Sequence, residues 1–280
     1  MGLLEKIVWL PLTKIMMKAL DMKRIHLFEF EDLGWFPTTI RIYMTRLILL
    51  MHKLLGTSPH IGQLFVKLLE KYPDKPIIDL CSGSGGPIKG VVDYLDDKAS
   101  IDDFKVTLTD LYPDMAAANE YNRQDGRISY RTEPLDVNHN EEIPLGIRSM
   151  ICSFHHLKPE LARAVLSNAQ IARQPILIYE MSDNRHPIWL WWISFPINFV
   201  MCLFITPWVR PMTWGQLLFT YIIPIIPLCF AWDGAVSNAR TYTLSDLDIL
   251  LADLDEEGYT WEKGIVEGKM PGLYLVGMPG

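Results

Sequence analysis

Short apolar runs and longer amphipathic stretches alternate through the middle of this chain. The runs have the length of strands, and the clearest helical stretch among them is 159–173. Strands are expected at 77–80, 105–109, 128–130, 149–154 and 175–180. Since strands that alternate with helices form a parallel sheet covered on both faces, the pattern predicts an α/β domain.

Two further strand-like runs, 259–266 and 273–276, close the chain. Gly268 and the pair Pro271-Gly272 separate them, and no helical pattern lies between. Strands joined by a turn pair antiparallel, whereas a parallel pair needs a longer crossover. The sequence therefore predicts a terminal antiparallel hairpin.

The N-terminal region, residues 1–59, has a helical pattern. From 38 to 55 apolar side chains recur at helical spacing between Pro37 and Gly56, and we expect this stripe to pack in a core. Residues 1–20 are apolar with interspersed lysines and have no small-residue cleavage site. They predict a helix on a membrane or in a core, and no signal peptide. We interpret the region as a membrane-proximal cap over a substrate site.

The composition narrows the class of protein. Of the 280 residues, 49% are hydrophobic and 21% are charged, which excludes a disordered or collagen-like chain. A net charge of −7 argues against nucleic acid as a partner. The cysteines are far apart, so a disulfide framework is not expected and a reducing compartment is favoured. They are Cys81, Cys152, Cys202 and Cys229.

The strongest hydrophobic signal is an insertion at 187–232. Arg210 divides it into two uncharged runs of 22 residues, 188–209 and 211–232, with tryptophans near their ends. As a helix each run would extend ~33 Å, enough for a hydrocarbon core of ~30 Å. The pattern predicts an apolar helical hairpin in a membrane. Prolines within both runs leave a re-entrant pair open, and an apolar lid on a soluble domain is the other alternative.

A hairpin would return the chain to the side of the bilayer that it left. The α/β domain, residues 60–186 and 233–280, would then stay whole on one face. The first 60 residues contain eight Lys or Arg against five Asp or Glu, and positive residues near a membrane favour its cytoplasmic side. We therefore expect a membrane-associated protein with its α/β domain on the cytoplasmic face and the lipid bilayer as a partner.

A glycine-rich loop follows the first predicted strand. The sequence from 77 to 87 is IIDLCSGSGGP, in which Asp79 precedes Gly83, Gly85 and Gly86. Glycines permit positive φ and close approach of a ligand, and a following helix N-terminus favours anions. The carboxylate of Asp79 suits the ammonium group of a cofactor that carries an amino acid better than it suits a pyrophosphate.

Two further acids follow the next two predicted strands, Asp110 directly after the second and Asp136 in the loop after the third. Asp110 stands where a carboxylate can accept hydrogen bonds from both hydroxyls of a ribose. Asp136 could reach an adenine amino group. A solvated loop acid remains the alternative for each. A nicotinamide cofactor is less favoured because the loop lacks G-x-G-x-x-G, with Ile88 at the position of the third glycine.

This order of features resembles the class I S-adenosylmethionine-dependent methyltransferases over roughly 60–186 and 233–280. The matching pattern begins at Asp79, continues through the glycine loop and Asp110, and ends with the run SFHH at 153–156. The resemblance implies a Rossmann-like sheet of seven strands whose last strand is antiparallel. It also implies S-adenosylmethionine as the cofactor.

The resemblance assigns the cofactor site by position. The methionine part would lie on Asp79 and the loop backbone, the ribose on Asp110 and the adenine on Asp136. Cys81 departs from the pattern, which often has a glycine there. The residues placed at the cofactor are Asp79, Cys81, Gly83, Gly85, Gly86, Asp110, Asp136 and Ser153.

His155 and His156 follow the fourth predicted strand, next to the expected sulfonium, and are candidate general bases for a hydroxyl or thiol acceptor. Glu180 ends the fifth strand and could orient the acceptor or take its proton. Histidines that only cap the loop are the alternative. Adjacent histidines without Cys or acid at ligand spacing argue against a metal site.

Asp233 and Arg240 follow the insertion and are candidate substrate residues at the same rim. Arg240 could hold a phosphate or carboxylate headgroup. A structural ion pair of Arg240 with Asp233 or Glu180 is the alternative.

The insertion leaves the sheet at the carboxyl ends of the strands, where open α/β sheets bind ligands. The sequence therefore predicts a membrane-associated methyltransferase that acts on a lipid or lipophilic small molecule, at an oxygen or sulfur atom. The stretches 217–227 and 232–243 are similar to a bacterial methyltransferase subgroup with an apolar insertion, which suggests no substrate. The alternatives are a non-catalytic membrane scaffold that binds S-adenosylmethionine and an NAD(P)-dependent Rossmann oxidoreductase.

Overall fold

A computed structural model describes residues 21–99, 101, 103–124, 126–187, 189–254, 257–269 and 271–280. The helix predicted within residues 1–20 lies outside these described residues, as does Ile188 at the start of the insertion.

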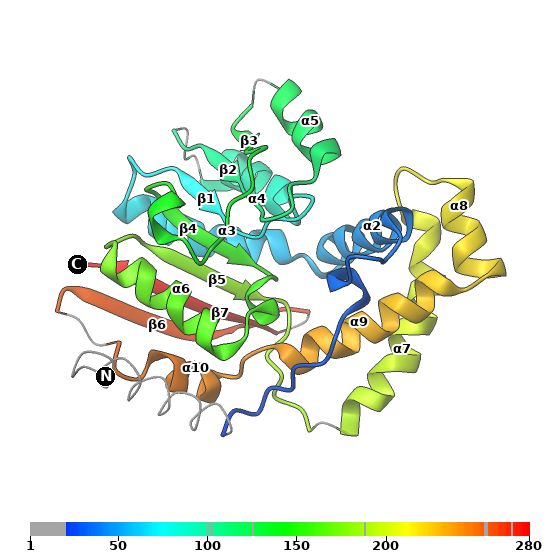
Figure 1. Cartoon of the computed structure of the whole chain (residues 1–280). Helices are drawn as coiled ribbons and strands as arrows, with labels where there is room; N and C mark the ends of the chain where they lie inside the picture. Colours follow the sequence, from blue (N-terminus) through cyan, green and yellow to red (C-terminus); the bar gives the residue numbers. More distant parts are fainter. Residues whose placement is uncertain are drawn as a thin grey trace, which may run out of the picture.

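Seven strands form one sheet in the order β3-β2-β1-β4-β5-β7-β6 (Figure 1). β7 pairs antiparallel with β5 and β6, and the remaining pairs are parallel. The strands are β1 (Ile77–Asp79), β2 (Val106–Leu108), β3 (Ile128–Tyr130), β4 (Ile147–Ile151), β5 (Ile176–Glu180), β6 (Tyr259–Val266) and β7 (Gly272–Pro279). The predicted α/β sheet with a terminal antiparallel hairpin is confirmed, although β4 begins two residues earlier than expected.

Helices cover both faces of this sheet. On one face lie α3 (Thr57–Lys71), α4 (Ile88–Tyr94) and α5 (Met115–Arg123), and on the other α6 (Pro159–Ile171) and α10 (Leu244–Leu251). Side chains of β5 alternate between the two cores: Leu177 and Tyr179 lie in the first, Ile176 and Ile178 in the second. This alternation is the period of two that a strand buried on both faces requires.

The insertion forms α7 (Trp189–Ile205), α8 (Trp214–Leu217) and α9 (Ile225–Arg240), with short helical turns at Thr206–Trp208 and Leu218–Ile222. α7 and α9 lie side by side, and α2 (Thr38–Leu55) packs against both, away from the sheet (Figure 1). Their shared core consists of Phe36, Ile40, Met44, Leu47, Cys202, Val209, Ile226, Cys229 and Phe230. The apolar stripe of the helix predicted at 38–55 therefore packs in a core, as expected.

Neither apolar run of 22 residues forms one straight helix in the described part of the insertion. The first run leaves the α-helix at Ile205, before Pro207, and the second breaks at Ile223-Pro224, because proline lacks the amide hydrogen that a continuous helix needs. No single described helix is both long and apolar enough to cross a bilayer. One pair, 214–222 with 225–240, passes that test together but is bent by 78°. The expected transmembrane hairpin is therefore not supported, and the re-entrant pair that the prolines left open stays a prediction.

The N-terminal region is joined closely to the rest of the chain. Its predicted boundary at residue 59 falls within α3, and the predicted boundary at 232 falls within α9. The Lys23 amide donates to Asp246 (2.9 Å), and the Ile25 amide donates to the carbonyl of Ala239 (2.9 Å). These bonds hold the irregular segment 22–29 along α9 and the start of α10, and the short turn Phe30–Asp32 follows it.

Candidate active site

The loop between β1 and α4 has the backbone geometry that its glycines predict. Gly83, Gly85 and Gly86 all have positive φ, and a Cβ on Gly85 would meet the hydroxyl oxygen of Tyr121 at 2.6 Å. Cys81 also has a positive φ, 55°, which is the conformation that favours glycine at this position. A Cβ on Gly83 would meet no described atom within 4 Å, so the loop is open there.

Asp79 lies beneath this loop and is almost fully buried. Its carboxylate accepts hydrogen bonds from the hydroxyls of Ser149 (2.6 Å) and Ser82 (2.7 Å). Burial raises the pKa of Asp79 to about 7, although both hydroxyls act in the opposite direction. The surroundings of Asp79 therefore disfavour its ionised form, and a cation bound at the loop would stabilise that form.

Asp110 joins the end of β2 to the loop. Its Oδ2 accepts from the amide of Gly83 (2.9 Å) and its Oδ1 from the amide of Tyr112 (2.8 Å). A carboxylate has about four lone pairs, so both oxygens can still accept from ribose hydroxyls. Tyr130 supports the loop from β3, since its hydroxyl donates to the carbonyl of Gly83 (2.7 Å).

The other predicted cofactor residues lie at the same edge of the sheet. Asp136 is half-buried after β3 and accepts from the backbone and side-chain amides of Asn138. Ser153 is buried after β4, with its Oγ 3.5 Å from the carbonyl oxygen of Leu80. Because β3, β2, β1 and β4 are parallel neighbours, their carboxyl ends form one row.

His155 is held by Glu180, which ends the neighbouring strand. Nδ1 of His155 lies 2.8 Å from Oε2 of Glu180, and its backbone amide donates to Oε1 (2.9 Å). A proton on Nδ1 leaves Nε2 as the basic nitrogen. This Nε2 is buried and has no hydrogen-bond partner among the described residues. The carboxylate therefore fixes one tautomer of the imidazole, as in a general base.

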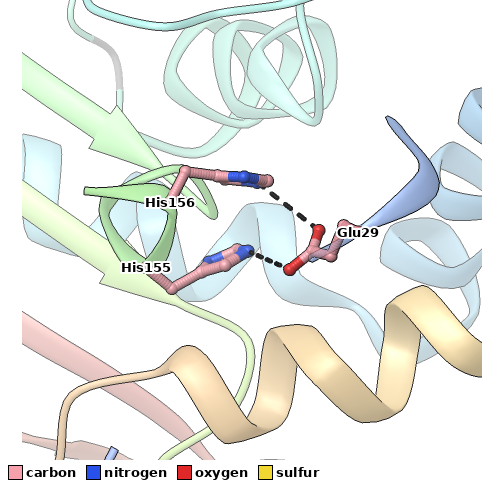
Figure 2. Close-up of side chains that lie close together, drawn as sticks. All are labelled: Glu29, His155 and His156. Atoms are coloured by element: carbon pink, nitrogen blue, oxygen red, sulfur yellow. Dashed lines mark ion pairs between the residues drawn. The ribbon is translucent and has the colours of Figure 1, made fainter. Parts of the chain in front are cut away.

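His156 stacks on His155 with ring centres 4.3 Å apart. Its Nδ1 lies 3.0 Å from Oδ1 of Asp32. The Nε2 atoms of both histidines face Glu29, each at 3.9 Å from one carboxylate oxygen (Figure 2). Burial acts to lower the pKa of His156, but the hydrogen bond to Asp32 and the charge of Glu29 outweigh it and raise the pKa to about 8.

Arg240 is a buried partner of the acids in this cluster. Its Nη1 lies 2.9 Å from Oε1 of Glu29 and 2.7 Å from Oδ2 of Asp32. These ion pairs replace the pairing with Asp233 or Glu180 that the sequence suggested.

Arg24 binds two backbone carbonyl groups next to the cluster. Its guanidinium donates to the carbonyls of Arg240 and His155, both at 2.7 Å. Asp233 instead accepts from the amides of Phe30 (2.7 Å) and Glu31 (3.2 Å). The two predicted substrate residues, Asp233 and Arg240, therefore both hold the segment 29–32 in place.

Glu29 and Asp32 are site residues that the sequence interpretation missed. Asp32 lies 124 residues before His156 in the chain, so no spacing rule connects the two. The available signal was compositional: three acids stand within Glu29–Asp32, in a region where Lys and Arg predominate.

An apolar pocket of about 430 Å³ adjoins the same segment. It is lined by Phe28, Phe30, Phe195, Ile225, Leu228, Cys229 and Trp232. Successive residues of an extended segment point to opposite sides, so Phe28 and Phe30 face the pocket while Glu29 faces the histidines. One short segment thus separates an apolar pocket from the polar cluster.

No family model matches this chain, and none of the curated proteins does. Among solved structures, LepI with S-adenosylhomocysteine and a substrate analogue is 12% identical (TM-score 0.45), over 74% of this chain and 43% of LepI. The plantazolicin methyltransferase BpumL with S-adenosylhomocysteine is 10% identical (TM-score 0.47), over 87% and 98%. Magnesium protoporphyrin IX methyltransferase ChlM from Synechocystis PCC 6803, also with S-adenosylhomocysteine, is 13% identical (TM-score 0.44), over 82% and 87%.

This chain spans less than half the length of LepI. The ligands in these structures agree with the predicted cofactor. At such low identities and TM-scores the likeness concerns the fold alone and carries no argument about the reaction of this chain.

Proposed function

We propose that this protein is an S-adenosylmethionine-dependent methyltransferase whose acceptor is a lipid or lipophilic small molecule with a hydroxyl or thiol group. The observation that carries the proposal is the buried His155–Glu180 pair at the ends of β4 and β5. These strands continue the row that begins with the glycine loop, and ligands of open α/β sheets bind at this edge.

We call the glycine loop with Asp79 and Asp110 the rim. Three of its features suit S-adenosylmethionine: an open backbone, an acceptor for ribose hydroxyls and a buried acid. The backbone is open at Gly83, Asp110 keeps lone pairs for hydroxyl groups, and an ammonium group would favour the ionised form of Asp79. Cys81 and Asp136, with Ser153, complete the proposed site. When bound, the cofactor supplies a methyl group on a sulfonium sulfur.

His155 would accept the proton of the acceptor at Nε2. Glu180 keeps the proton on Nδ1 and stabilises the imidazolium that forms. Glu29 faces this Nε2 at 3.9 Å, so its carboxylate borders the position that the acceptor would take.

The acceptor is proposed to be lipophilic because an apolar pocket and an exposed apolar surface adjoin the cluster. We call the exposed large hydrophobic side chains of α7–α9 and their turns the apolar surface. They are Ile193, Ile197, Val200, Phe204, Trp208, Trp214, Leu218, Tyr221, Ile222, Ile223, Ile225 and Leu228. Large exposed apolar patches mark interaction sites for membranes or proteins. We propose that this surface enters a bilayer from its cytoplasmic side, where four free cysteines fit reducing conditions.

Calorimetric titration of detergent-purified protein tests the cofactor. S-adenosylmethionine should bind, NAD should not, and Asp110→Ala should weaken binding. Binding of NAD instead would favour an oxidoreductase. A folded protein that binds no S-adenosylmethionine at millimolar concentration would overturn the proposal.

Transfer of a labelled methyl group into a lipid extract tests the reaction. His155→Ala should lower the rate by about 10²–10⁴-fold, the usual contribution of a general base, while cofactor binding persists. His139→Ala, which changes an exposed histidine paired with Glu142, is the matched control and should leave the rate unchanged. Cofactor binding without any methyl transfer would favour the non-catalytic scaffold.

Flotation with anionic vesicles tests the membrane contact. Phe204→Ser should reduce the bound fraction, because Phe204 lies on the apolar surface with 70% of its area exposed. Leu145→Ser is the control: Leu145 is 71% exposed but precedes β4, at the opposite edge of the sheet. Equal binding of the two variants would contradict the proposed surface.

A further inference from the structure

We propose that Glu29, His155 and His156 form a binding site for a divalent transition-metal ion. Together they offer two imidazole nitrogens and a carboxylate oxygen, all within 4.8 Å of one another (Figure 2). These are ligand types of zinc and non-haem iron sites. The inference rests on the proposed methyltransferase, since the ion would lie where the polar group of the acceptor is expected. It changes the role of His155 from a free base to a metal ligand. Metal binding can nevertheless be measured without any acceptor.

The Nε2 atoms of the two histidines and the carboxylate of Glu29 face one another but form no hydrogen bond with one another. Each Nε2 lies 3.9 Å from a carboxylate oxygen of Glu29, which is too long for a hydrogen bond. His155 is the clearer case, since its side chain is 7% exposed and its Nε2 has no hydrogen-bond partner among the described residues. At His155, the lone pair of Nε2 and the carboxylate of Glu29 repel unless a proton or a metal ion lies between them. One metal ion would satisfy all three groups.

The opposite ring nitrogens have the partners that metal-binding histidines use. Nδ1 of His155 contacts Glu180 (2.8 Å) and Nδ1 of His156 contacts Asp32 (3.0 Å). Histidines that ligate metals usually donate their second N–H to a carboxylate, which orients the ring and leaves the other nitrogen as the ligand. Histidines that only cap a loop have no need of two such carboxylates.

Charge and spacing are both compatible with an ion. The cluster contains three carboxylates, those of Glu29, Asp32 and Glu180, against the guanidinium groups of Arg24 and Arg240. His156, whose pKa is raised to about 8, gives up its proton when an ion binds, which leaves an excess of one negative charge. Ligand atoms of a tetrahedral zinc site are about 3.4 Å apart, so the three ligand atoms, which lie within 4.8 Å of one another, must draw closer together around an ion. Arg240 contacts Oε1 of Glu29 and leaves Oε2 to the ion.

Three protein ligands leave a coordination position for the oxygen or sulfur of an acceptor. A metal ion at that position lowers the pKa of the bound group. With the metal on Nε2 of His155, the proton of the acceptor would leave to solvent, and the nucleophile would form on the ion instead of beside a free imidazole.

Cobalt titration tests the site. Full-length protein in detergent is stripped with a chelator and titrated with Co²⁺ at mildly alkaline pH, with absorption of the d–d bands and bound metal as readouts. We expect one Co²⁺ per chain, displaced by Zn²⁺. Glu29→Gln and His156→Ala should weaken binding at least tenfold, and His139→Ala should leave it unchanged. The positioning variant Asp32→Asn should weaken it by about 10–100-fold.

Thermal unfolding and S-adenosylmethionine calorimetry on the same samples show which variants fold. If Glu29→Gln does not fold, the Co²⁺ spectrum of the wild type and the Co²⁺ affinity of His156→Ala decide whether the metal site exists. The metal site is overturned if the wild type binds no stoichiometric Co²⁺, or if folded variants bind as tightly as the wild type. S-adenosylmethionine binding in those same samples would leave the proposed methyltransferase standing.

Discussion

The glycine-loop rim and the histidine cluster lie at one edge of the same sheet, yet they are assembled in different ways. In the rim, Asp110 bonds to Gly83 across 27 residues, between loops that follow neighbouring strands. In the cluster, Arg24 reaches His155 across 131 residues. The rim therefore follows from strand order and local turns, whereas the cluster exists only because an N-terminal segment docks on α9.

The charged side chains of the two regions also differ in their burial and in their partners. Asp110 is half-buried and satisfied by backbone amides. Glu29 and Arg240 are both nearly excluded from solvent and depend on each other. Substitutions in the cluster should therefore mainly lower the stability of the protein, whereas substitutions in the rim should mainly weaken cofactor binding.

The largest expected effect is on the folding of the cluster. Arg240→Met removes the cation that pairs with Glu29 and Asp32, and breaking a buried pair costs about 3–5 kcal/mol of unfolding free energy. Burial acts to raise the pKa of Asp32, but His156 and Arg240 hold it well below its usual range. Urea unfolding measures the loss.

Lys67→Met is the matched control for this substitution. Lys67 pairs with Glu262 at the surface, where 47% and 41% of the two side chains are exposed. Such a pair contributes about 0–1 kcal/mol. Equal losses in the two variants would show that burial does not distinguish the cluster.

The next largest effect should be on cofactor binding by the rim. Asp110→Ala removes charge-assisted hydrogen bonds worth about 1.5–3 kcal/mol each, so calorimetry should show S-adenosylmethionine affinity lower by roughly 10–100-fold. His155→Ala should change this affinity less than about twofold, and the exposed Asp74→Ala serves as the charge control. If His155→Ala lost a comparable amount of S-adenosylmethionine affinity, the rim and the cluster would have to be parts of one binding site.

Backbone strain in the loop is a smaller effect. Gly85 has a φ of 97°, and an added methyl group would also meet Tyr121, so Gly85→Ala should cost about 1–3 kcal/mol. A Cβ on Gly34 would meet no described atom within 4 Å, and Gly34 has no positive φ. Gly34→Ala should therefore leave the thermal midpoint nearly unchanged. The loop geometry is wrong if both variants unfold alike.

The last effect is confined to a range of pH: it is the pH dependence that Asp79 contributes. Its pKa is raised from 3.8 to about 7, so between these values the unfolded chain has lost a proton that the native protein keeps. Stability should therefore fall as pH rises from about 4 to about 7, and level off above that range. Asp79→Asn should flatten this part of the profile, as followed by urea unfolding. An unchanged profile would mean that Asp79 ionises normally in the native protein.

The sequence alone determined the features that depend on local conformation. Apolar runs of strand length placed the strands, since side chains alternate between two cores, and the positive φ of Gly83 and Gly85 follows from the residue type. The acids Asp79 and Asp110 were visible because Asp79 ends β1 and Asp110 follows β2 by two residues. The prolines indicated that the apolar runs would bend or break but not where, since Pro196 and Pro227 lie inside α7 and α9.

Only the tertiary structure decided which side chains surround the histidines. The sequence placed Arg240 at the same edge of the sheet as the histidines, but nothing in the spacing of Glu29 and Asp32 relates them to His155 or His156. Their meeting depends on backbone bonds such as that from Ile25 to Ala239, which seat a whole segment on α9. A buried charge takes its partner from whichever element docks against it, and docking is a property of the folded surface and not of neighbouring residues in the chain.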